Sequence, residues 1–91
     1  MALRCEIDIG ETRIIQIGIH NIHGEPFNIL SADYKLAEKY TGDIVGTGKA
    51  DIEKHILRAV ITPPQAGTYL LKYTYQIGME TLVEVVEVKV K

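Results

Sequence analysis

The chain has 91 residues, of which 46% are hydrophobic and 24% charged, and its formal net charge is −2. This length accommodates one domain, residues 1–91, and the composition is that of a globular chain and not of a disordered one. A chain with this net charge lacks the excess of basic residues expected of a protein that binds nucleic acid or an anionic membrane surface. The single cysteine, Cys5, excludes an intrachain disulfide.

The first residues of the sequence predict no export signal. Residues 1–5 run directly into a strand pattern and contain no hydrophobic signal region. No stretch approaches the about 20 apolar residues needed to span a bilayer. The sequence therefore predicts cytoplasmic synthesis without a signal peptide, although a trimmed piece of an exported or larger protein would have the same beginning.

Hydrophobic residues recur with a period of two, which is typical of β-strands. Residues 3–9 alternate apolar and charged side chains and predict a first strand, with Cys5 buried on the same face as Ile7 and Ile9. Residues 12–20 predict a second strand with three isoleucines on its inner face. These are Ile15, Ile17 and Ile19.

The middle of the chain is less regular. Residues 27–36 predict a third strand, and residues 44–45 a weak strand broken by Gly46 and Gly48. Residues 50–54 are either a connection or an edge strand. In the third strand the residues expected to face inward are Ala32, Tyr34 and Leu36.

The last third of the chain contains the clearest strands, at residues 56–61, 68–77 and 81–90. The alternation of the last strand slips where Val85 and Val86 are adjacent, which predicts a β-bulge or cover on both faces. About seven short strands without a convincing helix predict an all-β fold, an antiparallel sandwich with Greek-key crossings.

One motif resembles a known superfold. Gly67 and Tyr69 lie in a Gly-x-Tyr-x-(buried residue) pattern that resembles the penultimate strand of immunoglobulin-like β-sandwich domains. The resemblance implies that the Tyr69 hydroxyl bonds to backbone at or upstream of Gly67, and that Leu71 replaces the second cysteine of antibody domains. The chain has no tryptophan, so Tyr34 or Leu36 is expected to fill that place in the core.

The layout of the whole chain is similar to small immunoglobulin-like structural modules of bacteriophages and prophages, such as tail, baseplate or head accessory proteins. The stretches that carry this similarity are "NIHGEPFNILSADYKL", "GTGKADI" and "PPQAGTYLLKYTYQIGMETLVEVVEV". The resemblance implies a structural component that could be incorporated into a phage particle.

The candidate metal ligands do not form a recognised motif. His20 and His23 flank a turn and could share a zinc ion with His55 or Cys5, but no Cys-x-x-Cys or His-Glu-x-x-His accompanies them. Calcium requires a dense set of oxygen ligands, whereas the available acids are separated by lysines. These acids are Asp43, Asp51 and Glu53. The sequence predicts no metal and no other cofactor.

Catalytic groups are equally sparse. Ser31 and Cys5 have no adjacent base with an orienting group, and Glu84 and Glu87 are interpreted as residues of a solvated strand face. The glycine-rich residues 42–48 precede no helix and lack the Gly-Lys-Ser/Thr of a phosphate loop. The sequence therefore predicts no catalytic residue and no enzyme.

The remaining functional signal is an apolar surface. Leu57, Leu70 and Val83 break the polar alternation of their strands and predict an outward patch, unless the core itself crosses that alternation. Tyr40, in a polar loop, is a candidate contact residue. The contact surface is predicted on the sheet that holds the last two strands. Its expected residues are Leu70, Lys72, Thr74 and Val83.

These observations predict a non-enzymatic protein-interaction or structural module that docks on itself or on an assembly partner, with a homo-oligomer as one form. A carbohydrate- or ligand-binding domain of a surface protein is the alternative. A stripe of tyrosines could form its platform, although their alternation with Leu71 and Ile77 favours the core. These are Tyr34, Tyr69, Tyr73 and Tyr75.

Overall fold

The structure is a computed structural model that describes residues 3–20 and 27–91. The described residues form eight strands and no helix, so none of them belongs to a helix able to cross a membrane. The strands are β1 (Leu3–Ile7), β2 (Arg13–Gly18), β3 (Ile29–Glu38), β4 (Ile44–Lys49), β5 (Asp51–Glu53), β6 (Ile56–Ile61), β7 (Gly67–Ile77) and β8 (Glu80–Val90).

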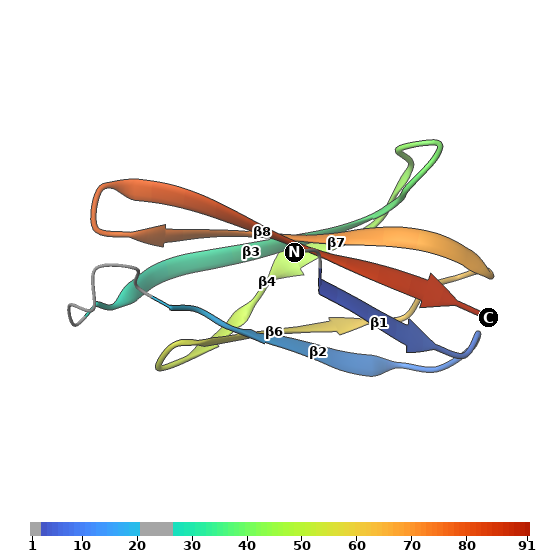
Figure 1. The fold of residues 1–91 in the computed structure, drawn as a ribbon, viewed down its shortest axis with the longest axis horizontal. Helices are drawn as coiled ribbons and strands as arrows, with labels where there is room; N and C mark the ends of the chain where they lie inside the picture. Colours follow the sequence, from blue (N-terminus) through green and yellow to red (C-terminus); the bar gives the residue numbers. More distant parts are fainter. Residues whose placement is uncertain (1–2, 21–26) are drawn as a thin grey trace.

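The strands form two sheets that face each other as the layers of a sandwich. Five strands in the order β1-β8-β7-β3-β4 make the larger sheet, and three in the order β2-β6-β5 make the smaller. In Figure 1, β3, β7 and β8 lie in one layer above β2 and β6. The all-β sandwich expected from the sequence, without a disulfide, is therefore confirmed.

One pair of strands departs from the antiparallel arrangement that the sequence predicts. β1 and β8 are parallel, with Leu3 opposite Val86 and Ile7 opposite Val90. The reason is that β1 and β2 belong to different sheets. β1 therefore cannot form a hairpin with its neighbour in the chain and pairs with the last strand.

Alternate side chains of both sheets fill the space between the layers. The inner faces predicted for residues 12–20 and 27–36 are confirmed, with Ile15 and Tyr34 half-buried and the other predicted residues buried. The described residues bury no polar or charged side chain. The buried core is Ile7, Ile17, Ile19, Ile29, Ala32, Leu36, Ala50, Leu57, Ala59, Ile61, Tyr69, Leu71, Tyr73, Tyr75, Val86, Val88 and Val90.

The last strand contains no bulge. β8 pairs with β7 in continuous register, with Val85 opposite Lys72 and Val86 opposite Leu71. Val86 is buried, whereas Val85 is 40% exposed on the opposite face. The bulge and the two-sided cover predicted at this point are both wrong. The valines are adjacent because one faces the core and the other faces away from it.

The two glycines predicted to break the fourth strand lie inside it, since β4 runs from Ile44 to Lys49. Gly48 is the register partner of Tyr34, and a Cβ at Gly48 would lie 3.0 Å from the Tyr34 ring. Glycine therefore makes room for a large aromatic side chain on the neighbouring strand. The residues predicted as a connection or edge strand form β5, at the edge of the smaller sheet.

The first strand is shorter than predicted. β1 ends at Ile7, and Ile9 lies in the following turn, where it is 53% exposed. Cys5 is half-buried and not buried, because β1 is an edge strand of the larger sheet. Partial burial raises the pKa of the Cys5 thiol, which keeps the less reactive thiol form at neutral pH.

The turn before β7 has the hydrogen bond implied by the Gly-x-Tyr motif. The Tyr69 hydroxyl donates to the Gln65 carbonyl oxygen at 2.8 Å, and the Tyr69 side chain is buried. Gly67 has a φ of 151°, which side-chain-bearing residues rarely adopt. The bond predicted at or upstream of Gly67 is therefore confirmed.

Tyr69→Phe is expected to lower the free energy of unfolding by about 0.5–1.5 kcal/mol, the usual net value of one hydrogen bond. The ring stays in place, so the change isolates the hydroxyl. Urea unfolding followed by circular dichroism measures the difference. Tyr40→Phe is the matched control, because the Tyr40 side chain is 79% exposed. Equal stabilities for the two variants would contradict a stabilising bond to Gln65.

Candidate interaction surface

We call the side of the larger sheet that points away from the smaller sheet the outer face. It is built from the residues that alternate with the core residues of β7, β8, β3 and β4. Three rows of register partners cross it from β8 to β4. The rows are Val83–Thr74–Asp33–Lys49, Val85–Lys72–Lys35–Thr47 and Glu87–Leu70–Ala37–Ile44.

Four residues that the sequence predicts as a contact surface lie on the outer face. Val83 is 47% exposed, Leu70 and Thr74 are half-buried, and Lys72 is exposed. Their common location follows from the alternation of β7 and from the antiparallel pairing of β7 with β8. The sequence did not identify Val85, although it has the same parity as Val83.

Tyr40 lies at the turn between β3 and β4, close to the third row of the outer face. The Lys39 Nζ atom is 5.6 Å from the centroid of the Tyr40 ring and 3.6 Å from Oε1 of Glu87. The turn is held by the bond from the Gly42 amide to the Glu38 carbonyl oxygen, at 2.9 Å. Tyr40 is therefore an exposed aromatic residue beside the outer face.

Leu57 does not belong to this surface, so its prediction as part of the outward patch is wrong. It is 0% exposed, in the central strand of the smaller sheet. The strand 56–61 is apolar at both parities, and only Arg58 marks a solvent-facing side. Arg58 shares its parity with Ile56 and Val60, which places Leu57 on the inner face.

A shallow hollow of about 380 Å³ opens on the outer face. Lys35 and Lys72 lie opposite each other across β3 and β7, and Thr47 continues their row on β4. Sequence alternation indicated that Lys35 points outward, but only the pairing of β3 with β7 brings it to Lys72. The lining residues are Asp33, Tyr34, Lys35, Thr47, Gly48, Lys72 and Thr74.

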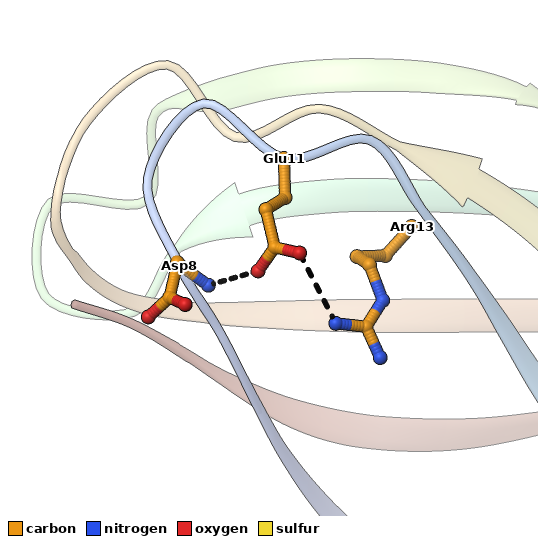
Figure 2. Close-up of polar contacts among 3 residues, drawn as sticks. All are labelled: Asp8, Glu11 and Arg13. Atoms are coloured by element: carbon orange, nitrogen blue, oxygen red, sulfur yellow. Dashed lines mark hydrogen bonds and ion pairs between the residues drawn. The ribbon is translucent and has the colours of Figure 1, made fainter.

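A second, smaller hollow of about 210 Å³ lies at the turn between β1 and β2. Figure 2 shows its polar contacts: Oε1 of Glu11 accepts from the Asp8 amide at 2.8 Å, and Oε2 lies 3.4 Å from an Arg13 guanidinium nitrogen. Nearby, Lys91 bonds to the Glu6 carboxylate at 3.0 Å, which lowers the pKa of Glu6. The two glutamates are paired within the chain, and the contacts of Glu11 close the turn.

The predicted metal-ligand candidates do not converge within the described residues, which contain no group of three or more possible ligands. The His55 ring stacks on Phe27 at a centroid distance of 4.0 Å, and its Nε2 lies 3.0 Å from the Phe27 carbonyl oxygen. His20 is exposed, and His23 lies outside the described residues. His55 thus has a packing role in this structure.

The acidic residues proposed for other chemistry are also dispersed. Glu53 accepts a 2.6 Å hydrogen bond from Arg58 on the smaller sheet, whereas Asp43 lies in the β3–β4 turn of the larger sheet. Glu84 is opposite Tyr73 and Glu87 opposite Leu70, so the two glutamates point to opposite faces of β8. Their assignment to one solvated face is therefore wrong, because residues three apart in a strand alternate in direction.

Comparison with known proteins adds evidence for the fold. No family model matches the chain, and no curated protein matches it in sequence. A crystal structure of an engineered protein is similar, with a TM-score of 0.71 and 16% sequence identity over 99% of this chain. The chain spans 18% of the length of that engineered protein. At this identity the similarity supports the fold alone.

Proposed function

We propose that this chain is a non-enzymatic protein-interaction module that docks through the outer face of its larger sheet. The observation that carries the proposal is the pair of exposed valines in neighbouring rows, Val83 and Val85, beside Leu70. An apolar group of this kind on a sheet with polar neighbours is typical of protein contact surfaces. A partner would cover these side chains and exclude water from them.

The proposal also includes an immunoglobulin-like fold for the chain and a role within a larger assembly. The hydrogen bond from Tyr69 to Gln65, with Leu71 in the core, supports an immunoglobulin-like domain. Such a domain would serve as a structural part of a larger assembly, of which a phage particle is the example suggested by the layout of the sequence. Self-association and an assembly partner are both compatible with the outer face.

The carbohydrate-binding alternative has less support. A sugar platform needs aromatic rings exposed on one surface, but Tyr69, Tyr73 and Tyr75 are buried between the sheets. Tyr34 is half-buried with its ring against Gly48. Tyr40 alone among the tyrosines is exposed, and one ring does not form a platform.

Val83→Lys is expected to leave the fold intact and to weaken association. Val83 is half-exposed, so the substitution should change the free energy of unfolding by about 0.5 kcal/mol or less. A buried charge at the contact should weaken binding by about tenfold or more. Light scattering over a concentration series measures self-association, and quantitative affinity capture from source cells measures binding of other proteins.

Val60→Lys is the matched control. Val60 is 51% exposed and lies on the outward side of the smaller sheet, so the variant makes the same chemical change in the other layer. If the proposal is right, Val60→Lys still self-associates or still binds the captured proteins, and Val83→Lys does not. Identical behaviour of both variants and the native chain would rule out the outer face as the docking surface.

A further inference from the structure

The lining of the hollow on the outer face contains two lysines, Lys35 and Lys72, and one acid, Asp33. Lys35 and Lys72 are direct register partners, and like charges at such positions are destabilising. Among the described residues, no carboxylate oxygen lies within 4.0 Å of either ammonium group. Within the described residues, this pair of positive charges therefore has no ion-pair partner.

The other end of the outer face shows the contrast. There, Glu87 lies 3.9 Å from Arg4 and 3.6 Å from Lys39, so the positive charges have an acid within the chain. In the first two rows of the outer face, three lysines accompany one acid, Asp33, whose register partner on β4 is Lys49; the other two are Lys35 and Lys72. This region is locally positive on a chain whose net charge is −2.

We propose that this hollow binds the carboxylates of an acidic segment of a partner protein, an inference that rests on the proposed docking function. The ammonium groups of Lys35 and Lys72 would donate to the carboxylate oxygens, and the hydroxyls of Thr47 and Thr74 add donors in the same hollow. Charge complementarity selects an acidic partner.

The apolar residues beside the hollow indicate which other side chains the bound segment should carry. Val85 continues the row of Lys72, and Val83 continues the row of Thr74. A segment that places carboxylates on the lysines therefore brings its adjacent side chains onto valines, which favours acidic residues interspersed with apolar ones. A phosphate backbone lacks such apolar groups and would leave the two valines uncovered.

Lys72→Glu tests the proposal because it separates binding from stability. The new carboxylate faces Lys35 and relieves the like-charge pair, so the urea midpoint should stay the same or rise. Binding of an acidic segment should fall by about tenfold or more, because repulsion replaces attraction. Lys54→Glu is the control: it makes the same change of net charge in the turn that joins the strands of the smaller sheet.

The probe is a peptide of alternating glutamate and valine, titrated into the ¹⁵N-labelled full chain and followed by amide chemical shifts. A glutamine–valine peptide, inorganic phosphate and single-stranded DNA serve as comparisons. We expect saturable shifts at Lys35, Thr47, Lys72 and Thr74 with the acidic peptide. They should weaken with added salt and with Lys72→Glu, and persist with Lys54→Glu.

Each of four binding results would overturn the inference: no saturable shift, unchanged binding by Lys72→Glu, equal or tighter binding of phosphate or DNA, or shifts at these amides on raising protein concentration alone. A lower urea midpoint for Lys72→Glu would also contradict it, since Lys72 would then support the fold. If Val83→Lys weakens association and Lys72→Glu does not, docking on the outer face stands and only the acidic partner is wrong. If neither does, the proposed function fails as well.

Discussion

Leu57→Ala is expected to lower the free energy of unfolding by about 2–5 kcal/mol. Leu57 is fully buried, opposite Ile17 on one side and Ile52 on the other, in the middle of the smaller sheet. Truncation removes its contacts and leaves a cavity, because paired strands on both sides limit collapse around it. The free energy of unfolding of a small domain is about 5–15 kcal/mol, so this loss is a large part of the total stability.

Val60→Ala provides the comparison within the same strand. Truncation of the half-exposed Val60 side chain should lower the free energy of unfolding by about 0.5 kcal/mol or less, because water already reaches this side chain in the folded state. Urea unfolding of both variants, followed by circular dichroism, gives the two values. Equal losses of unfolding free energy in the two variants would contradict the inward orientation of Leu57 and would indicate that its side chain lies on the surface.

Tyr73→Phe is expected to cost about 1–3 kcal/mol near neutral pH and to reduce the sensitivity of the fold to alkali. The Tyr73 side chain is fully buried, and its hydroxyl donates to the Ile15 carbonyl oxygen, linking the two sheets. Removing the hydroxyl leaves this part-buried acceptor without that donor. The ring remains, so the cost is smaller than that of a cavity.

The pH dependence follows from the protonation of the phenol. Burial raises the pKa of Tyr73 above its usual value near 10, and a hydrogen bond between the phenol and the Ala59 backbone offsets this in part. The folded chain therefore holds the proton more tightly than the unfolded chain. The stabilisation is constant below about pH 10 and is lost as the pH rises above that value.

Urea unfolding at neutral pH and at about pH 11 gives the free energy of unfolding of the native chain and of Tyr73→Phe under both conditions. The native chain should lose more stability than the variant between the two conditions. Some loss should remain in the variant, because burial also raises the pKa of Tyr75. An identical alkaline loss in both proteins would show that Tyr73 does not control it.

The sequence by itself determined the properties that depend on one strand at a time. The alternation of residues 68–77 placed Tyr69, Leu71, Tyr73 and Tyr75 in the core, and the structure agrees. The resemblance of the Gly-x-Tyr motif to immunoglobulin-like domains predicted a hydroxyl bond at or upstream of Gly67, and the acceptor is Gln65, four positions before Tyr69 in the chain. Side-chain direction in a strand follows from local backbone geometry, so neighbours in the chain suffice to read it.

Strand pairing was decided only by the tertiary structure. The strand 56–61 is apolar on both faces, so the fate of Leu57 depended on which sheet covered it. The parallel pairing of β1 with β8 and the meeting of Lys35 with Lys72 join residues that are distant in the chain. Register between such strands depends on which faces can be buried together, a property of the assembled sheets that no single stretch of sequence contains.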